Sequence, residues 1–429
     1  MNQPRSIRPG PGRAAGTPIV AIAVAVALSL AASSSAADFE NYGQARDFLV
    51  SKTNVVELTG ENGERVAICP QLQGRVMTST TGDLEGPSFG WINRRFIEAG
   101  QQDKHFNNYG GEDRFWLGPE GGPFSLWFAP GATQDLDNWI TPPALNDGEF
   151  EIVSGKQEPY YRLARRMKFG NTAGTQFDLE VSREIHLQKA HDFGALFGSD
   201  AQAALDSGDV RLVGFQTINT ITNQGQAMSR EKGLVSIWSL GQFPAGARTF
   251  VIVPYRTGNE SKLGPIVNSD YFGRVPPDRL RVTSDAIWFL ADGRFRSKIG
   301  VSQPRAKPIA GAIDLGNGVL TLVHFTMPDD PTNFSYVNNT WGRQAEPYRG
   351  DVANSYNDGP PEPGRPALGG FFEIESLSPA AQLPTGKSLS HTQTTFHVTG
   401  SSAALAQIAK AALGVDVKLS RPAGGQTQR

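Results

Sequence analysis

Cysteine is almost absent from this sequence, and histidine is scarce. The chain has one cysteine and six histidines among 429 residues. A lone cysteine cannot close an internal disulfide, so the fold has to be stabilised by its core. Cys69 stands in the apolar run 66–70, which favours a buried packing residue over a nucleophile. His105 stands just before a glycine-rich loop and is the histidine that we expect to take part in chemistry.

The chain also lacks an excess of charge of either sign. It carries 40 Lys and Arg residues against 42 Asp and Glu residues, which gives a formal net charge of −2. A surface for nucleic acid needs a basic stripe, so this balance argues against a nucleic-acid partner.

A long hydrophobic run is missing as well. The apolar stretch 19–32 is too short to span a bilayer comfortably. It follows three arginines and precedes the small residues 33–37 and Asp38. This order is typical of a secretory signal peptide, 1–37, cleaved near Ala37. We therefore expect a periplasmic or secreted protein without membrane contact after cleavage. An uncleaved anchor is the alternative, because the leader is long for a signal.

Turn residues and strand-like segments are abundant. The 48 glycines and 29 prolines indicate many turns. Helices are expected only at 39–52, 200–207 and 401–413. Strands are expected at 55–58, 65–68, 75–80, 124–128, 150–153, 160–168, 177–181, 210–222, 234–239, 249–253, 287–290, 319–325, 370–375 and 389–398. The pattern predicts an all-β, mainly antiparallel sandwich or barrel, with a single domain at 38–420 and a disordered tail at 421–429.

The segment 107–120 gathers aromatic, acidic and basic residues around paired glycines. Aromatic rings cover the apolar faces of sugars, while carboxylates and guanidinium groups bind hydroxyls. The residues here that we expect at a sugar site are Glu112, Asp113, Arg114 and Trp116. The alternative is a glycine-rich turn tied by an internal ion pair.

A second polar and aromatic region covers 336–341 and 348–359. Its candidate sugar-binding residues are Asn339, Trp341, Asn354 and Tyr356. The stretch 351–369 is dense in Asn, Asp, Pro and Gly and is expected to be a long loop, a kind of loop that is usually functional.

The same stretch allows a different interpretation. Hard oxygen ligands suit Ca²⁺, and such oxygens belong to Asp351, Asn354, Asn357 and Asp358. The spacing fits no EF-hand, so a loop tied by Asx turns remains the alternative. We expect no other metal and no cofactor.

A third segment, 369–379, carries two acids two residues apart. Glu373 and Glu375 would share one face of a strand, and neighbouring carboxylates raise one another's pKa, which suits proton transfer near neutral pH. The alternative is the exposed acidic face of an ordinary strand.

Three segments in this order resemble the galactose mutarotase-like (aldose 1-epimerase-like) superfamily. They are the strand 73–77 with Arg75, the loop 110–120, and the block 370–379 with its followers 383–387 and 391–394. The resemblance is nearest to an exported bacterial branch without assigned function. It implies a β-supersandwich with a few short helices, Arg75 in the substrate site, and a catalytic base at Glu373 or Glu375.

One departure from that superfamily concerns the acid. Trp238 stands about where its catalytic histidine is expected, so we expect Trp238 to line the substrate site and His105 or Arg114 to serve as acid or electrophile. We therefore expect a monomeric carbohydrate-binding envelope protein that epimerises its sugar or eliminates across it. A binding protein of the same fold without turnover, or a structural envelope protein, is the alternative.

Overall fold

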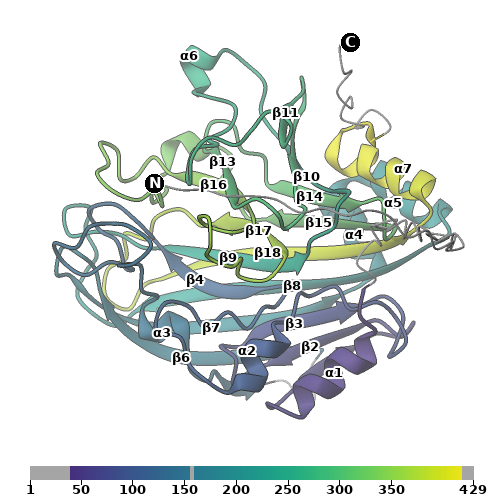
Figure 1. Cartoon of the computed structure of the whole chain (residues 1–429), viewed down its shortest axis with the longest axis horizontal. Helices are drawn as coiled ribbons and strands as arrows, with labels where there is room; N and C mark the ends of the chain where they lie inside the picture. Colours follow the sequence, from purple (N-terminus) through teal and green to yellow (C-terminus); the bar gives the residue numbers. More distant parts are fainter. Residues whose placement is uncertain (1–38, 155–158, 418–429) are drawn as a thin grey trace, which may run out of the picture. The chain divides into compact units, whose positions relative to one another are not determined.

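Three β-sheets, in which every pair of named strands is antiparallel, form the framework of the structure (Figure 1). The structure is a computed structural model and describes residues 39–154 and 159–417. The expected signal peptide, 1–37, and tail, 421–429, lie outside the described residues. The prediction of a mainly antiparallel β fold with a few short helices is confirmed.

The largest sheet has ten strands and a second sheet has five. In spatial order, the ten are β11 (Leu280–Val282), β12 (Ala286–Leu290), β10 (Thr249–Pro254), β14 (Ile309–Asp314), β15 (Val319–Phe325), β18 (Ser388–Gly400), β8 (Val210–Asn223), β7 (Gln176–Gln188), β6 (Tyr160–Gly170) and β5 (Glu151–Ser154). The five are β13 (Ser297–Ser302), β16 (Asp351–Asn357), β17 (Phe371–Leu377), β9 (Ser236–Pro244) and β4 (Arg114–Gly118).

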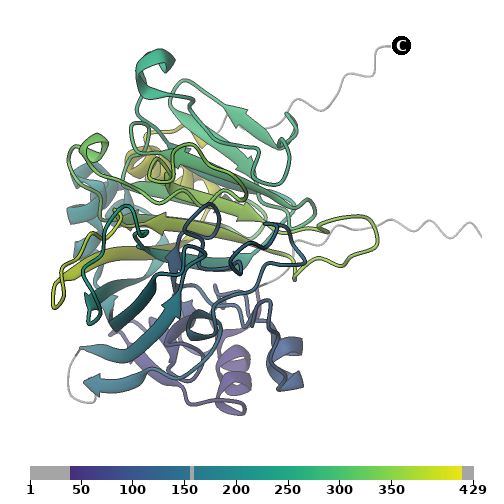
Figure 2. The ribbon, with the colours of Figure 1, turned by 90° about the vertical axis from the view of Figure 1, so that its left-hand side faces the viewer.

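The third sheet has three strands and lies near the start of the described chain. Its strands are β1 (Val56–Thr59), β2 (Arg65–Cys69) and β3 (Arg75–Thr80). Figure 2 shows them, in purple and blue, with α1 (Tyr42–Val50) and α2 (Arg94–Ala99) in the lower part of the view. Cys69 is fully buried among apolar side chains here, as predicted.

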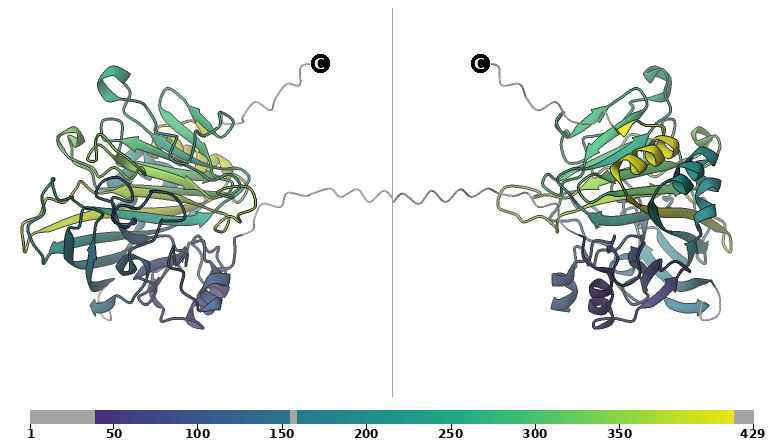
Figure 3. Two further views of the ribbon diagram at one scale, coloured as in Figure 1. Left: turned by 60° about the vertical axis from the view of Figure 1, so that its left-hand side comes forward. Right: turned by 90° about the vertical axis from the view of Figure 1, so that its right-hand side faces the viewer.

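Three helices cover the outer face of the ten-stranded sheet (Figure 3). They are α4 (Ala190–Phe197), α5 (Ser199–Ser207) and α7 (Ser402–Leu413). Alternate residues of β15 and β18, such as Leu322 and Phe396, pack against them in one apolar cluster. The α7 helix begins where the Ser401 hydroxyl accepts the amide N–H of Ala404. The remaining short helices are α3 (Pro143–Asn146), α6 (Glu260–Leu263) and the 3₁₀ turn η1 (Pro331–Asn333).

The inner face of the ten-stranded sheet packs against the five-stranded sheet. Phe215 of β8 and Ile374 of β17 belong to the same buried core. Hydrogen bonds cross the same interface, because Ser376 of β17 bonds His391 of β18 at 2.8 Å and Asn219 of β8 bonds Ser239 of β9 at 3.0 Å. The odd-numbered residues of β9 and the even-numbered residues of β17 therefore face the core. Their neighbours along each strand face the other way.

Two predicted elements are wrong. Residues 124–128 form turns and bends instead of a strand, because the Ser125 hydroxyl donates to the carbonyl of Glu120 and accepts the N–H of Trp127 at 3.0 Å, which closes a local turn. The expected long loop 351–369 begins with the buried strand β16. Polar residues there are paired inside the protein, so their composition gave a misleading loop signal.

Candidate functional site

A cavity of about 430 Å³ lies on the face of the five-stranded sheet that points away from the core. Its volume is within the range of small-molecule sites. Aromatic lining residues are Phe106, Trp116, Trp139, Trp238, Phe272, Trp341, Tyr356 and Phe371. Ionisable lining residues other than tyrosine are Asp103, His105, Arg114, Glu120, Arg296, Lys298, Arg365 and Glu373.

Strand register brings distant parts of the sequence to this face. Lys298 is the cross-strand partner of Tyr356, and Tyr356 is the partner of Glu373. In the next row of the same face, Glu375 and Arg114 are both partners of Leu240, on opposite sides of β9. Side chains two residues apart on a strand share a face, so one surface collects groups from five strands.

Glu373 and Arg114 form a buried ion pair at the cavity wall, with 2.9 Å between nitrogen and oxygen. Burial raises the pKa of Glu373 to about 7; Arg114 and Lys298 act against this increase, and repulsion from Glu375 adds to it. The Arg114 guanidinium lies 4.2 Å from the centroid of the Trp116 ring. Its Nε and Nη1 groups are buried and have no partner among the described residues. These donors could bind a ligand.

Glu375 is fully buried in the next row of the same sheet face and does not line the cavity. It accepts hydrogen bonds from Lys298 Nζ at 2.9 Å and from the Trp238 indole at 3.0 Å. Burial alone would lower the pKa of Lys298, but attraction to Glu375 and Glu120 outweighs it and raises the pKa. Lys298 is therefore held as a cation beneath the aromatic wall.

Glu120 is a third carboxyl group of the site, and the sequence prediction missed it. It accepts the indole N–H of Trp139 at 2.7 Å, and its own backbone N–H donates to Asn339 at 2.9 Å. Burial raises the pKa of Glu120 while Lys298 opposes the increase. The residue stands at the end of the segment 107–120, so the local composition did point to its region.

His105 lines the cavity near Glu120. Its Nδ1 lies 2.6 Å from the carbonyl oxygen of Trp139. A carbonyl only accepts, so Nδ1 carries the hydrogen and a neutral ring keeps Nε2 as the acceptor. The predicted residues Trp116, Trp238, Trp341 and Tyr356 line the same cavity, together with Arg114 and Glu373.

Besides Glu375, three predicted residues from the first half of the chain lie outside the cavity. Arg75 donates to the carbonyl of Gly110 at 2.8 Å. Glu112 accepts from Ser79 and lies 2.9 Å from His397, and Asp113 pairs with Arg183. Asp113 alternates with Arg114 and so faces the core. Glu112 precedes the strand, after two glycines with φ of 92° and 108°, a conformation that redirects the chain.

Asn339 and Asn354 lie behind the wall and support it. Asn339 bonds the backbone of Glu120, and Asn354 donates to the Tyr271 hydroxyl at 3.0 Å. Gly300 is the cross-strand partner of Asn354 and leaves space for the Asn354 side chain. A Cβ at position 300 would lie 2.6 Å from the Asn354 amide nitrogen.

The oxygens proposed for Ca²⁺ are engaged with protein donors. Asp351 accepts from Tyr271 and from Asn268 at 3.3 Å, while Asp358 accepts the N–H of Gly370 at 3.0 Å. Across 39–154 and 159–417, no three His, Cys, Asp or Glu side chains cluster as metal ligands would. In those ranges, no helix is long and apolar enough to cross a bilayer.

A family model matches residues 40–421 of the chain. The chain belongs to this family, described as a family of unknown function (DUF6786). No curated protein matches the chain.

Solved structures with a similar fold share little sequence with the chain. A proposed aldose 1-epimerase of Escherichia coli K12 has 12% identity and a TM-score of 0.47, covering 81% of this chain and 99% of its own. The Slr1438 protein of Synechocystis sp. PCC 6803 has 14% identity and a TM-score of 0.45, covering 81% and 96%. A proposed mutarotase (YeaD) of Salmonella typhimurium has 12% identity and a TM-score of 0.39, covering 81% and 90%.

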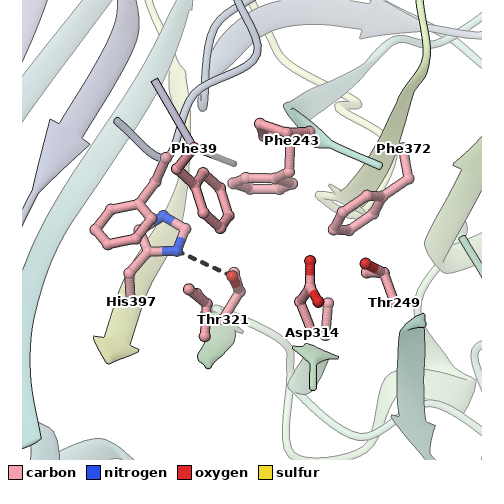
Figure 4. Close-up of a pocket in the computed structure, with 11 residues that line it drawn as sticks. Phe39, Phe243, Thr249, Asp314, Thr321, Phe372 and His397 are labelled. Atoms are coloured by element: carbon pink, nitrogen blue, oxygen red, sulfur yellow. Dashed lines mark hydrogen bonds between the residues drawn. The ribbon is translucent and has the colours of Figure 1, made fainter. Parts of the chain in front are cut away.

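A second, much smaller void lies between the five-stranded and ten-stranded sheets (Figure 4). Its volume of about 20 Å³ suits one water molecule and is too small for a sugar. His397 lies at its edge and bonds the Thr321 hydroxyl at 2.9 Å, as the dashed line in Figure 4 marks. The other labelled residues are Phe39, Phe243, Thr249, Asp314 and Phe372. Of these two spaces, only the 430 Å³ cavity is large enough for a sugar. A further hollow of about 700 Å³, lined by residues such as Arg230 and Tyr348, shares no lining residue with that cavity.

Proposed function

We propose that this protein binds a sugar, or the end of an oligosaccharide, in the 430 Å³ cavity and moves a proton on it. Glu373 is the group that transfers the proton. The observation that carries the proposal is this carboxyl group at the cavity wall, whose pKa burial raises to about 7. An acid with such a pKa both accepts and donates protons readily near neutral pH.

The walls of the cavity suit a sugar. The indole rings of Trp116 and Trp139 offer flat apolar surfaces, and their centroids lie 6.5 Å apart. The buried Arg114 donors without protein partners supply hydrogen bonds to hydroxyl groups. Such a mixture of aromatic surface and a few fixed polar groups is typical of small-molecule sites.

The chemistry divides among three groups. Glu373 takes a proton from the bound sugar as general base, and Glu120, whose pKa burial raises, returns a proton as general acid. Arg114 stays charged at any ordinary pH, so it stabilises negative charge instead of giving a proton. The sequence prediction of Arg114 as an electrophile fits this division better than a role as an acid. Epimerisation and elimination both need a base and an acid of this kind.

A second candidate is a sugar-binding protein without turnover. Two observations favour it: Arg114 already holds Glu373, and Trp238 occupies the position where the resemblance expects a histidine. In this case the same cavity binds the sugar and no proton is transferred.

The experiment combines binding with turnover in the mature protein. Proton NMR follows anomeric exchange, epimer formation and any new double bond across a panel of monosaccharides and oligosaccharides, beside a thermal-shift measurement of binding. For the enzyme, we expect Glu373→Gln to retain binding and lose product formation. Glu61→Gln, at an exposed turn residue outside the cavity, is the matched control and should change neither.

The possible outcomes separate the candidates. Binding without product in the unaltered protein supports the second candidate and overturns the first. Absence of binding across the panel overturns both. We further propose that the protein works as a monomer after export to the periplasm or medium. N-terminal sequencing of the mature protein tests the export, because a cleaved signal peptide leaves a chain that starts after Ala37.

A further inference from the structure

Arg296 differs from the other cations of the cavity wall. Arg114, Lys298 and Arg365 each lie within 4.0 Å of a carboxylate. Among the residues that the structure describes, no carboxylate comes this close to Arg296. A guanidinium group carries five N–H donors and keeps its charge. The cavity therefore contains one cation that the protein itself does not neutralise.

The Arg296 side chain is held in place by neutral groups. Its guanidinium lies 3.6 Å from the centroid of the Phe272 ring, and its charge acts against the increase that burial gives the pKa of Tyr356. The Tyr356 hydroxyl donates to Asp358 at 3.1 Å, and Asp358 is fixed by the N–H of Gly370 at 3.0 Å. Stacking on Phe272 orients the guanidinium without consuming its charge, which is how a ligand-binding arginine is arranged in advance.

The acids of the cavity do not supply the missing negative charge. Glu373 is paired with Arg114, and Glu120 accepts the Trp139 indole N–H at 2.7 Å and attracts Lys298, whose pKa it raises. Asp103, the remaining carboxylate of the lining, is exposed to solvent and accepts the backbone N–H of His105 at 2.8 Å. A ligand that brings one negative charge would balance Arg296.

We propose that the ligand of this cavity is an acidic sugar whose carboxylate is bound by Arg296. This inference rests on the proposed function and names the substrate class of the same site. Guanidinium and carboxylate match as planar forks that form two parallel hydrogen bonds. One unpaired cation suits the single charge of a carboxylate better than the near-double charge of a phosphate.

The test compares acidic and neutral partners of the same sugar. The mature protein is titrated by calorimetry with galacturonate against galactose and glucuronate against glucose, as monosaccharides and short oligosaccharides. Glucose 6-phosphate is a third arm. We expect the acidic sugars to bind at least about tenfold more tightly than their neutral partners, since hydrogen bonds to charged groups contribute this much.

Variants show whether Arg296 carries the preference. Arg296→Gln should remove the preference for acidic sugars, and Arg296→Lys, which keeps the charge but not the fork, should retain part of it. Arg294→Gln is the matched control, because Arg294 is exposed in the same segment and does not line the cavity. Circular dichroism of each variant establishes that it is folded.

Four results would overturn the inference, and they are distinguishable. If neutral sugars bind as tightly as acidic ones, or if Arg296→Gln behaves like Arg294→Gln, the assignment is wrong while the proposed function stands. If glucose 6-phosphate binds more tightly than glucuronate, the carboxylate is the wrong anion. If no sugar of any kind binds, the proposed function itself fails.

Discussion

Arg114 and Glu373 lie 2.9 Å apart although their strands are not neighbours. Strand β9 separates β4 from β17, and the pair forms across Leu240, which is the register partner of Arg114. Both side chains are more than nine-tenths buried, with 3% and 8% exposure. Arg114 opposes the effect of burial on the pKa of Glu373, so each member of the pair influences the stability and the proton transfer that depend on the other.

Replacing Arg114 by Gln should leave Glu373 as an uncompensated buried carboxyl group. Removing one partner of a buried pair costs about 3–5 kcal/mol, unless the acid becomes neutral. Because Arg114 lowers the pKa of Glu373, its loss should raise that pKa further. We expect a lower Tm and, for an active enzyme, an acid limb of the pH–rate profile that moves to higher pH. An unchanged profile would show that Arg114 does not set the acidity of Glu373.

Stability should depend on pH through Glu373. The pKa of Glu373 is raised from its ordinary value of 4.5 to about 7 in the folded state, so the folded state binds the proton more tightly than the unfolded state. This contribution to stability is fully present below pH 4.5 and is lost as pH rises through about 7. Urea unfolding at several pH values should give a flatter stability curve for Glu373→Gln than for the unaltered protein. Equal slopes would mean that Glu373 titrates normally.

Lys298 and Glu375 should stabilise the protein only as a pair. Lys298→Met alone should destabilise it by about 3–5 kcal/mol, because Glu375 then remains charged and buried. The double variant Lys298→Met with Glu375→Leu should recover a large part of the loss. A double-mutant cycle by urea unfolding measures the coupling, and additive losses would argue that the two residues act independently.

Gly300→Ala should disturb the cavity from behind. The new Cβ would lie 2.6 Å from the Asn354 amide nitrogen and would also clash with Asp351, so we expect a loss of about 1–3 kcal/mol. Gly225→Ala is the control, since the nearest atom to its Cβ is at 3.4 Å. Equal Tm values for both variants would contradict the requirement for glycine at 300.

The sequence predicted the parts of the site that local periodicity controls. The two-residue spacing of Glu373 and Glu375 does put both on one strand face, and the same rule joins Arg114 to Trp116. Composition predicts a loop at 351–369, but the polar residues of β16 are paired inside the protein and form a strand.

Other residues of the site had no local signal. Lys298 stands in a strand that the sequence analysis did not identify, and it enters the site only because β13 pairs with β16. Glu120 is held by the indole N–H of Trp139, and Arg296 is oriented by the ring of Phe272. Such groupings arise from strand order and from loops that meet over a sheet, and neither is encoded in the spacing of nearby residues.

Side chains along the strands of the five-stranded sheet alternate between the cavity and the core, so substitutions at neighbouring positions affect different parts of the protein. Arg114, Trp116 and Glu373 lie in the cavity, while the residues between and beside them, Phe115 and Phe372, are part of the core. A mutagenesis library restricted to every second position of these strands would change the cavity wall and leave Phe115 and Phe372 in place. Such a library would have to keep the buried ion pairs of Arg114 and Lys298 intact, because those pairs lie on the cavity face and their loss lowers stability.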